Sequence, residues 1–347
     1  MFRTFLILLV IITVTGCNHG LPLRLSEPSD QALDRLEKYL PGLMQENNVS
    51  GVGIAVIRGN KIVLMESFGI ANDLTRELIN SDTVFEVASL GKPIFAYVSV
   101  SLSQSGLFDL DVPLVNYVPD LFSSPDPRLR KITARMVLSH SSGLPNFGST
   151  SPESLSFDPS SAYAYSGIGF EKLQLVLEAL TGKTLNQLAT NIVFEPFEMD
   201  STSYIWNEEL SFRFAKGYNN NGMQNYESRK PKKGNAAWSL YSTTADYARF
   251  VTRMMRENDP VSMTMIYPQI TITNEISWSL GWGLQSTKPN SSFWHWGSNP
   301  GYRAYVVGYP AEKIAVVVLS NSEHMFKLIE DIVQMTIGGE LPSYHWF

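Results

Sequence analysis

The chain contains a single cysteine, Cys17, among its 347 residues, so no disulfide bond can form within it. Charged residues make up only 17% of the sequence, below the ~25% of an average soluble protein, and the net charge is −6. A basic surface for nucleic acid is therefore not expected. The five histidines include no His-Glu-x-x-His pair, which together with the lone cysteine predicts neither a metal site nor a cofactor.

Residues 1–16 have the pattern of a bacterial signal peptide. Arg3 supplies the positive charge, and the apolar run over residues 5–12 is shorter than the ~20 residues that a membrane-spanning helix needs. The run ends in Val14-Thr15-Gly16-Cys17, which resembles a lipobox, where the cysteine is lipidated and becomes the first mature residue. We therefore expect a tether over 17–29 and a lipid-anchored protein of the bacterial cell envelope, on the outer membrane in a Gram-negative cell. The alternative is a signal peptide with an incidental cysteine.

Hydrophobic periodicity places strands at both ends of the remaining chain and helices between them. Helical spacing predicts helices over 30–46, 94–100, 171–180, 185–194, 246–256 and 322–337. Strands are predicted over 52–57, 62–68, 293–296, 302–309 and 314–319. This order predicts an α+β fold (an α/β sandwich) over 30–347. Its antiparallel sheet would draw strands from both ends of the chain, with helices flanking it and a mainly helical lobe inserted at roughly 83–240.

A hydroxyl and an amine stand three residues apart in Ser89-Leu90-Gly91-Lys92, directly before a buried helical run. Side chains at positions i and i+3 share one face of a helix, so Ser89 and Lys92 are expected to meet. A serine becomes nucleophilic beside a base, and a lysine serves as that base when burial lowers its pKa. The alternative for an isolated match is an N-cap serine followed by a first-turn lysine.

Three further segments accompany this pair in a definite order. They are Leu138-Ser139-His140-Ser141-Ser142-Gly143, Tyr163-Ala164-Tyr165-Ser166-Gly167 and Trp294-His295-Trp296-Gly297-Ser298. Together with Ser89-x-x-Lys92 they resemble the serine β-lactamase-like family. The resemblance is to the branch that holds class C β-lactamases, D-Ala-D-Ala carboxypeptidases, D-aminopeptidases and related esterases. It covers about residues 35–325 and implies the β-lactamase/transpeptidase-like fold.

The resemblance implies a role for each matching residue. Ser89 would be acylated, Lys92 would take or hold its proton, and Tyr165 would shuttle protons to the leaving group, with Lys92 as the charge that helps the phenol ionise. The backbone N–H groups of Ser89 and Ser298 would form an oxyanion hole. Gly297 would let the substrate approach the strand closely. Tyr163 is a weaker alternative to Tyr165, and His140 is expected to hold a turn.

Two positions depart from the family pattern. Gly167 stands where the family has an asparagine, and His295-Trp296 stand where it has Lys-Thr. A histidine is mostly neutral at pH 7 and binds a carboxylate less well than a lysine does. We expect His295 to face the substrate, with a packed strand histidine as the alternative. Trp296 and three other aromatic residues are candidates to line the pocket: Trp282, Trp294 and Tyr302.

The expected function is therefore hydrolysis of a small-molecule ester, amide or peptide through an acyl-enzyme on Ser89. One alternative is a β-lactamase or D-Ala-D-Ala carboxypeptidase that acts on lactams or cell-wall peptides. A second alternative, from another class, is a non-catalytic binding or sensor protein on the same scaffold.

Overall fold

The computed structural model of the chain describes residues 22–345, except 148, 150, 227–228 and 288–289. The predicted signal peptide and Cys17 lie outside the described residues. Within those residues, no helix is both long and apolar enough to cross a bilayer.

A nine-stranded antiparallel sheet forms the centre of the molecule, in the order β3-β2-β1-β13-β12-β11-β10-β9-β8. Its strands come from both ends of the chain, as predicted, and β1 pairs with β13 to join them. The strands are β1 (Gly51–Arg58), β2 (Lys61–Asn72), β3 (Glu77–Leu78), β8 (Ile270–Thr271), β9 (Ile276–Trp278), β10 (Gly283–Thr287), β11 (Asn290–Asn299), β12 (Tyr302–Tyr309) and β13 (Ile314–Ser320).

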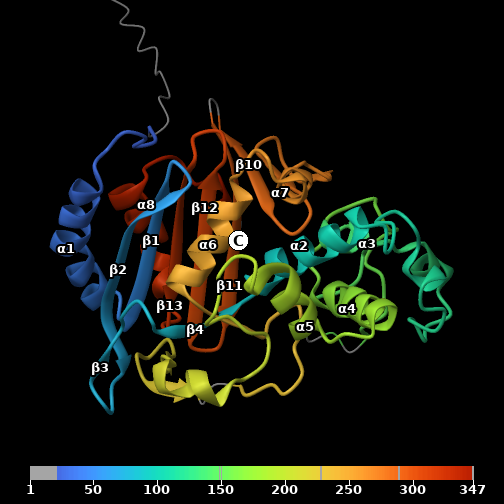
Figure 1. Cartoon of the computed structure of the whole chain (residues 1–347), viewed down its shortest axis with the longest axis horizontal. Helices are drawn as coiled ribbons and strands as arrows, with labels where there is room; N and C mark the ends of the chain where they lie inside the picture. Colours follow the sequence, from blue (N-terminus) through green and yellow to red (C-terminus); the bar gives the residue numbers. More distant parts are fainter. Residues whose placement is uncertain (1–21, 148, 150, 227–228, 288–289, 346–347) are drawn as a thin grey trace, which may run out of the picture.

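Helices cover both faces of this sheet, which is why its central strands are buried on both sides. On one face, α1 (Ser29–Glu46) and α8 (Ile329–Thr336) pack on a hydrophobic core with β1, β12 and β13. On the other face lies α6 (Thr244–Met254), which contacts β1, β2 and β13. Beyond α6 stands the helical lobe, on the opposite side of the molecule from α1 (Figure 1). The predicted fold class is confirmed.

The helical lobe leaves and rejoins the sheet domain through one pair of short strands. Strand β4 (Val84–Ala88) leads into it, β7 (Leu240–Thr243) leads out, and the two pair antiparallel. Both therefore hold the lobe in place beside the sheet. The lobe contains α2 (Gly91–Gln104), α3 (Ala134–Leu138), α4 (Gly167–Thr181) and α5 (Leu185–Ala189), and α7 (Pro260–Met265) packs on α2. The small hairpin of β5 (Gly217–Tyr218) and β6 (Gln224–Tyr226) lies beside the end of β13, where Tyr218 forms a β-bridge with Ser322.

Three segments differ from the sequence prediction. Residues 22–28, expected to belong to the tether, lie on the body of the protein, because Leu23 forms a β-bridge with Gly338 and the Arg24 side chain donates to the Gln334 carbonyl. The predicted closing helix over 322–337 is shorter, with a 3-10 turn at Met325–Leu328 before α8. The predicted helix over 185–194 ends at Ala189 and continues as a π turn.

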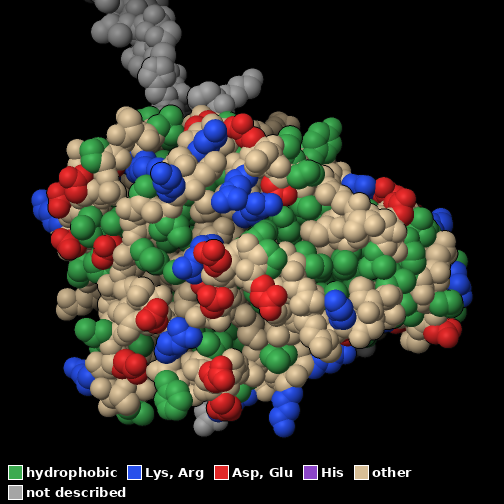
Figure 2. Space-filling view, viewed as in Figure 1, with side chains coloured by type: hydrophobic (Ala, Val, Ile, Leu, Met, Phe, Trp, Pro, Cys, Tyr) green, Lys and Arg blue, Asp and Glu red, His purple; other side chains and the backbone are tan. Residues whose placement is uncertain are grey.

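The face of the molecule shown in Figure 2 carries acidic and basic side chains interspersed with one another. This mixture agrees with the modest net charge and with the absence of a basic excess in the sequence.

Candidate active site

Ser89 lies in the tight turn between β4 and α2, at the junction of the sheet and the helical lobe. The residue before it, Ala88, has φ +53°, a left-handed conformation that non-glycine residues seldom adopt. Such local strain occurs where the surrounding structure imposes it, often at functional sites. The N–H of Lys92 donates to the Ser89 carbonyl at 3.0 Å, which closes the turn and begins the helix.

The Lys92 side chain reaches back to the nucleophile as the i, i+3 spacing predicts. Its Nζ lies 3.1 Å from Ser89 Oγ and donates to the Ala237 carbonyl at 2.7 Å. Ser89 Oγ also donates to the Ala237 carbonyl, at 3.3 Å. The Ala237 carbonyl oxygen, in the segment just before β7, therefore accepts hydrogen bonds from both side chains. The sequence analysis did not identify this group.

Burial lowers the pKa of Lys92 to about 7, while the charge of Glu171 opposes that shift. The side chain is almost completely buried, and its Nζ lies 4.8 Å from the centre of the Tyr165 ring. An ammonium loses solvation in such a place, so the neutral amine is favoured. A substantial fraction of Lys92 is therefore available as a base near neutral pH.

Tyr165 lies directly before α4, with its ring between His140 and Trp296 at centroid distances of 4.2 and 5.1 Å. Burial raises the pKa of Tyr165, and hydrogen bonding with Ser89 only partly opposes this. The phenol is therefore neutral at physiological pH. The expectation that Lys92 helps the phenol to ionise is not met, because burial dominates the pKa of Tyr165.

His140 holds the turn before α4, as expected. Its Nδ1 accepts from the Ser166 N–H at 3.0 Å. Burial, with Lys92 and His295 nearby, holds the pKa of His140 well below its usual value. His140 is therefore an uncharged side chain that packs against the Tyr165 ring.

His295 is also buried, at 0% exposure, so it presents no side-chain surface to solvent. Its Nδ1 lies 2.7 Å from the Trp296 carbonyl, and since a carbonyl only accepts, Nδ1 carries the hydrogen. Burial and the neighbouring Lys92 lower the pKa of His295 to about 3. The ring is neutral, so it offers no positive charge to a substrate carboxylate. Its position agrees with the packed-histidine alternative.

Of the four aromatic residues that were candidates to line the pocket, three belong to the core. Trp282, Trp294 and Tyr302 are at most 1% exposed. Only Trp296 is partly exposed, and it stacks near Tyr165. Large aromatic side chains usually fill cores, and the alternation of a strand does not by itself distinguish a core aromatic residue from one that lines a pocket.

Strand β11 presents Ser298 along an edge where, among the described residues, no strand pairs with it on the β10 side. Strand β12 pairs with β11 as far as Asn299, whereas β10 pairs with it only as far as Trp294. Ser298 itself is exposed. Within the described residues, no acceptor takes the Ser89 N–H. This arrangement is compatible with the predicted oxyanion hole between these two N–H groups.

Asn299 ties this strand to the nucleophile's surroundings. Its Nδ2 donates to Glu86 Oε2 at 2.7 Å and to the Trp238 carbonyl at 3.2 Å. The bonds connect β11, β4 and the segment that carries Ala237. The sequence analysis did not single out Asn299, because these partners are far away along the chain.

Gly297 is required by the protein's own packing, which is a different reason from the predicted approach of substrate. A Cβ added there would lie 2.1 Å from the Val87 carbonyl oxygen of β4. The missing side chain lets β11 lie against the strand that ends at the nucleophile.

Replacing Gly297 with alanine is expected to destabilise the fold by about 1–3 kcal/mol or more, because a backbone atom must move to admit the methyl group. Thermal unfolding should show a lower Tm, and hydrolysis should slow as β11 moves from Ser89. Gly42→Ala in α1 is the matched control, since its Cβ would meet no atom within 4 Å. Equal Tm values for the two variants would contradict this explanation.

Gly167 also occupies a closely packed position. Its N–H donates to Asn146 Oδ1 at 3.0 Å, and an added Cβ would lie 2.3 Å from the Phe147 ring. Phe147 is 43% exposed, so it forms part of the surface beside the site. The loop that carries Asn146 and Phe147 fills the space next to Gly167, and the sequence analysis did not identify either residue.

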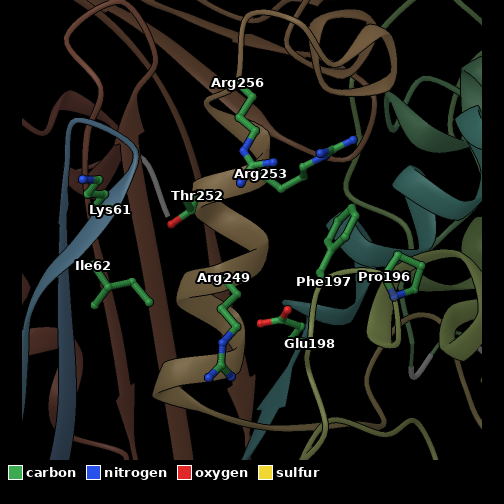
Figure 3. Close-up of a pocket in the computed structure, with 9 residues that line it drawn as sticks. All are labelled: Lys61, Ile62, Pro196, Phe197, Glu198, Arg249, Thr252, Arg253 and Arg256. Carbon is green, nitrogen blue, oxygen red and sulfur yellow. The ribbon is translucent and has the colours of Figure 1, made fainter.

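A separate cavity of about 420 Å³ lies between β2, α6 and the segment at 196–198. Arg249 and Arg253 come from successive turns of α6, Arg256 follows the end of that helix, and the three side chains point in different directions (Figure 3). Two of them already pair with carboxylates, Arg249 with Asp246 and Arg253 with Asp259. None of the residues that surround Ser89 lines this cavity, so it is not part of the candidate site.

Comparison with known proteins identifies the family of this chain. The family model described as "Beta-lactamase" matches residues 36–336. Protein flp of Staphylococcus aureus (strain MRSA252) is 22% identical over 344 residues, a match that covers 89% of this chain and 66% of that protein. The chain thus spans slightly less than two thirds of the length of this relative.

Two solved structures show the same fold. A class C beta-lactamase superposes with a TM-score of 0.76 at 21% identity, over 88% of this chain and 97% of the other. The D-alanine carboxypeptidase AmpC from Burkholderia cenocepacia superposes with a TM-score of 0.75 at 18% identity, over 88% and 99% of the two chains.

Proposed function

The chain belongs to the beta-lactamase family, and from this premise we propose that it hydrolyses an ester or amide bond through an acyl-enzyme on Ser89. The observation that carries the proposal is the contact of Lys92 Nζ with Ser89 Oγ at 3.1 Å. The lysine is buried and its pKa is lowered to about 7. A serine hydroxyl beside an amine that is partly neutral near pH 7 is an activated nucleophile.

In the proposed reaction, Ser89 Oγ attacks the carbonyl carbon of the substrate and its proton passes to Lys92 Nζ. The N–H groups of Ser89 and Ser298 stabilise the oxyanion of the tetrahedral intermediate. Tyr165, a neutral phenol, gives its proton to the leaving group and regains one from Lys92. Water then attacks the ester on Ser89, which releases the acid and restores the free hydroxyl.

We expect esters to be better substrates than lactams. Recognition of a lactam carboxylate needs a nearby positive charge, and His295, at the position where the family has a lysine, is neutral. Loss of such a charge partner weakens binding of the carboxylate by about 2 kcal/mol or more, which lowers kcat/KM for the lactam by at least roughly 30-fold. Phe147 beside Gly167 adds an apolar surface, which suits an apolar acyl group.

The test compares hydrolysis of p-nitrophenyl butyrate with hydrolysis of nitrocefin and release of D-alanine from a pentapeptide. The expected result is ester hydrolysis that exceeds both other rates. A higher kcat/KM for nitrocefin or for the peptide would replace the proposed substrate class with that of a lactamase or carboxypeptidase. Ser89→Ala measures the background in all three assays.

We also propose that Cys17 is lipidated and anchors the protein in the cell envelope. In bacteria that express the full chain, an alkyne fatty acid fed to the cells should label the protein, and fractionation should place it with membranes. Cys17→Ser should remove the label. A labelled Cys17→Ser variant, or an unlabelled wild-type protein found free of membranes, would contradict the anchor.

A further inference from the structure

A row of polar side chains on α4 faces the segment that carries the Ala237 carbonyl. Glu171 and Gln174 are three residues apart, so they share one face of the helix. Gln174 is buried; its Oε1 accepts from the Ala236 N–H at 2.9 Å and its Nε2 donates to the Gly234 carbonyl at 2.9 Å. These bonds fix the backbone on either side of Asn235.

Asn235 connects Glu171 to the nucleophile's surroundings. Its Nδ2 donates to Glu171 Oε1 at 2.5 Å, and its Oδ1 accepts from the Ala237 N–H at 2.9 Å. The Ala237 carbonyl in turn holds Lys92 Nζ at 2.7 Å and Ser89 Oγ at 3.3 Å. A continuous chain of hydrogen bonds thus runs from Glu171 through Asn235 and Ala237 to Lys92.

Glu171 also acts on Lys92 through its charge. The titratable groups that face Lys92 are Glu171 from α4, Tyr165 from the turn before it, His140 from the loop after α3, and His295 from β11. Burial keeps Tyr165, His140 and His295 neutral. The Glu171 carboxylate is therefore the negative charge that opposes the cost of burying a protonated Lys92.

We propose that Glu171 and Asn235 are positioning residues for the reaction at Ser89. Asn235 holds the Ala237 carbonyl where it orients the amine, and Glu171 anchors Asn235 and sets the pH at which the amine becomes a base. The role of these two residues rests on the proposed function, since it concerns the same nucleophile. Asn235 therefore affects the orientation of the Lys92 amine, whereas Glu171 also affects its protonation.

Two measurements on the whole protein test this role. The first is the rate of p-nitrophenyl butyrate hydrolysis between pH 5 and 10. The second is a ¹³C NMR titration of the Lys92 side chain in lysine-labelled protein, assigned by the signal lost in Lys92→Met. The NMR titration requires no catalysis, so it reports on Glu171 even if the wild-type protein hydrolyses none of the esters and the proposed function fails.

In Glu171→Gln the amide oxygen still accepts from Asn235, but the charge is gone. The acidic limb of kcat/KM and the Lys92 titration should both move to lower pH by about one unit, because the ammonium loses its counter-charge. The plateau at high pH should change by less than about threefold. Glu195→Gln removes an equal charge from an exposed position and should move neither midpoint.

In Asn235→Ala the charge stays and the orientation is lost. The plateau should fall about tenfold with the acidic limb near its wild-type position, in line with a misplaced catalytic group. Glu171→Asp keeps the charge and shortens the reach, so it should resemble Asn235→Ala and provides a second variant if Glu171→Gln folds poorly. A Lys92 titration in Glu171→Gln that coincides with wild type, or a wild-type rate in Asn235→Ala, would overturn the proposal.

Discussion

Replacing Ser89 with alanine should abolish hydrolysis, with a loss on the order of 10⁴-fold or more in kcat, as in other enzymes that lose a covalent nucleophile. The change removes one oxygen at a partly exposed turn, where Oγ bonds to Lys92, the Ala237 carbonyl and Tyr165. The fold should therefore survive. Mass spectrometry after treatment with a fluorophosphonate should find the adduct on Ser89 in the wild type and no adduct in the variant.

The control for Ser89→Ala is a neighbouring serine with a structural bond. Ser99 lies on α2 and donates to the Phe95 carbonyl at 2.8 Å, away from Lys92. Ser99→Ala should keep both the adduct and the rate within a few-fold. If Ser89→Ala retained ester hydrolysis, or if the adduct formed on another residue, the acyl-enzyme proposed here would be wrong.

Replacing Lys92 with methionine should lower kcat/KM by about 10²–10⁴-fold, the usual contribution of a general base. Methionine keeps an apolar chain of similar length in the buried site. In the wild type, kcat/KM should fall as the pH drops through about 7, the pKa to which burial lowers Lys92. The residual activity of the variant should lack this limb. A wild-type profile that is flat from pH 5 to 9 would exclude Lys92 as the base.

The same substitution should change how stability depends on pH. Lys92 has a pKa of about 7 in the folded protein and 10.5 as a free side chain, so the unfolded chain binds more protons between these values. Above pH 10.5 the amine is neutral in both states, so its titration does not lower the free energy of unfolding. As the pH falls from 10.5 to about 7, the free energy of unfolding decreases by about 5 kcal/mol in total. Denaturant unfolding should show wild type losing stability relative to Lys92→Met from pH 10 to pH 7. A constant difference between the two proteins would contradict the burial of a titrating lysine.

The sheet was predictable to within a few residues where both faces of a strand are buried. The strand predicted over 302–309 is β12 residue for residue, and β1 and β13 each extend the prediction by one or two residues. These runs are rich in valine and isoleucine, which is typical of strands covered on both sides. Strands β8–β10 were not predicted, because they are short and their side chains do not alternate clearly.

The candidate site was predictable only where its contacts are local. The pairing of Ser89 with Lys92 depends on a spacing of three residues, which the sequence displays directly. The partners Ala237, Asn235 and Glu171 lie roughly 80 to 150 residues from Ser89 and belong to no motif that the sequence analysis used. They are backbone or ordinary polar groups, whose importance comes only from the place to which the fold brings them.

The sequence by itself determined the order of most strands and helices, the family likeness and the pairing of the candidate nucleophile Ser89 with Lys92, because these follow from hydrophobic periodicity and from residues close together along the chain. Only the tertiary structure decided the protonation of the site, with Lys92 shifted toward the neutral amine, Tyr165 a phenol and His295 uncharged and buried. The physical reason is that a pKa depends on how much water and which charges surround a group. Those surroundings are assembled here from β4, α2, α4, β11 and the segment before β7, which meet only when the chain has folded.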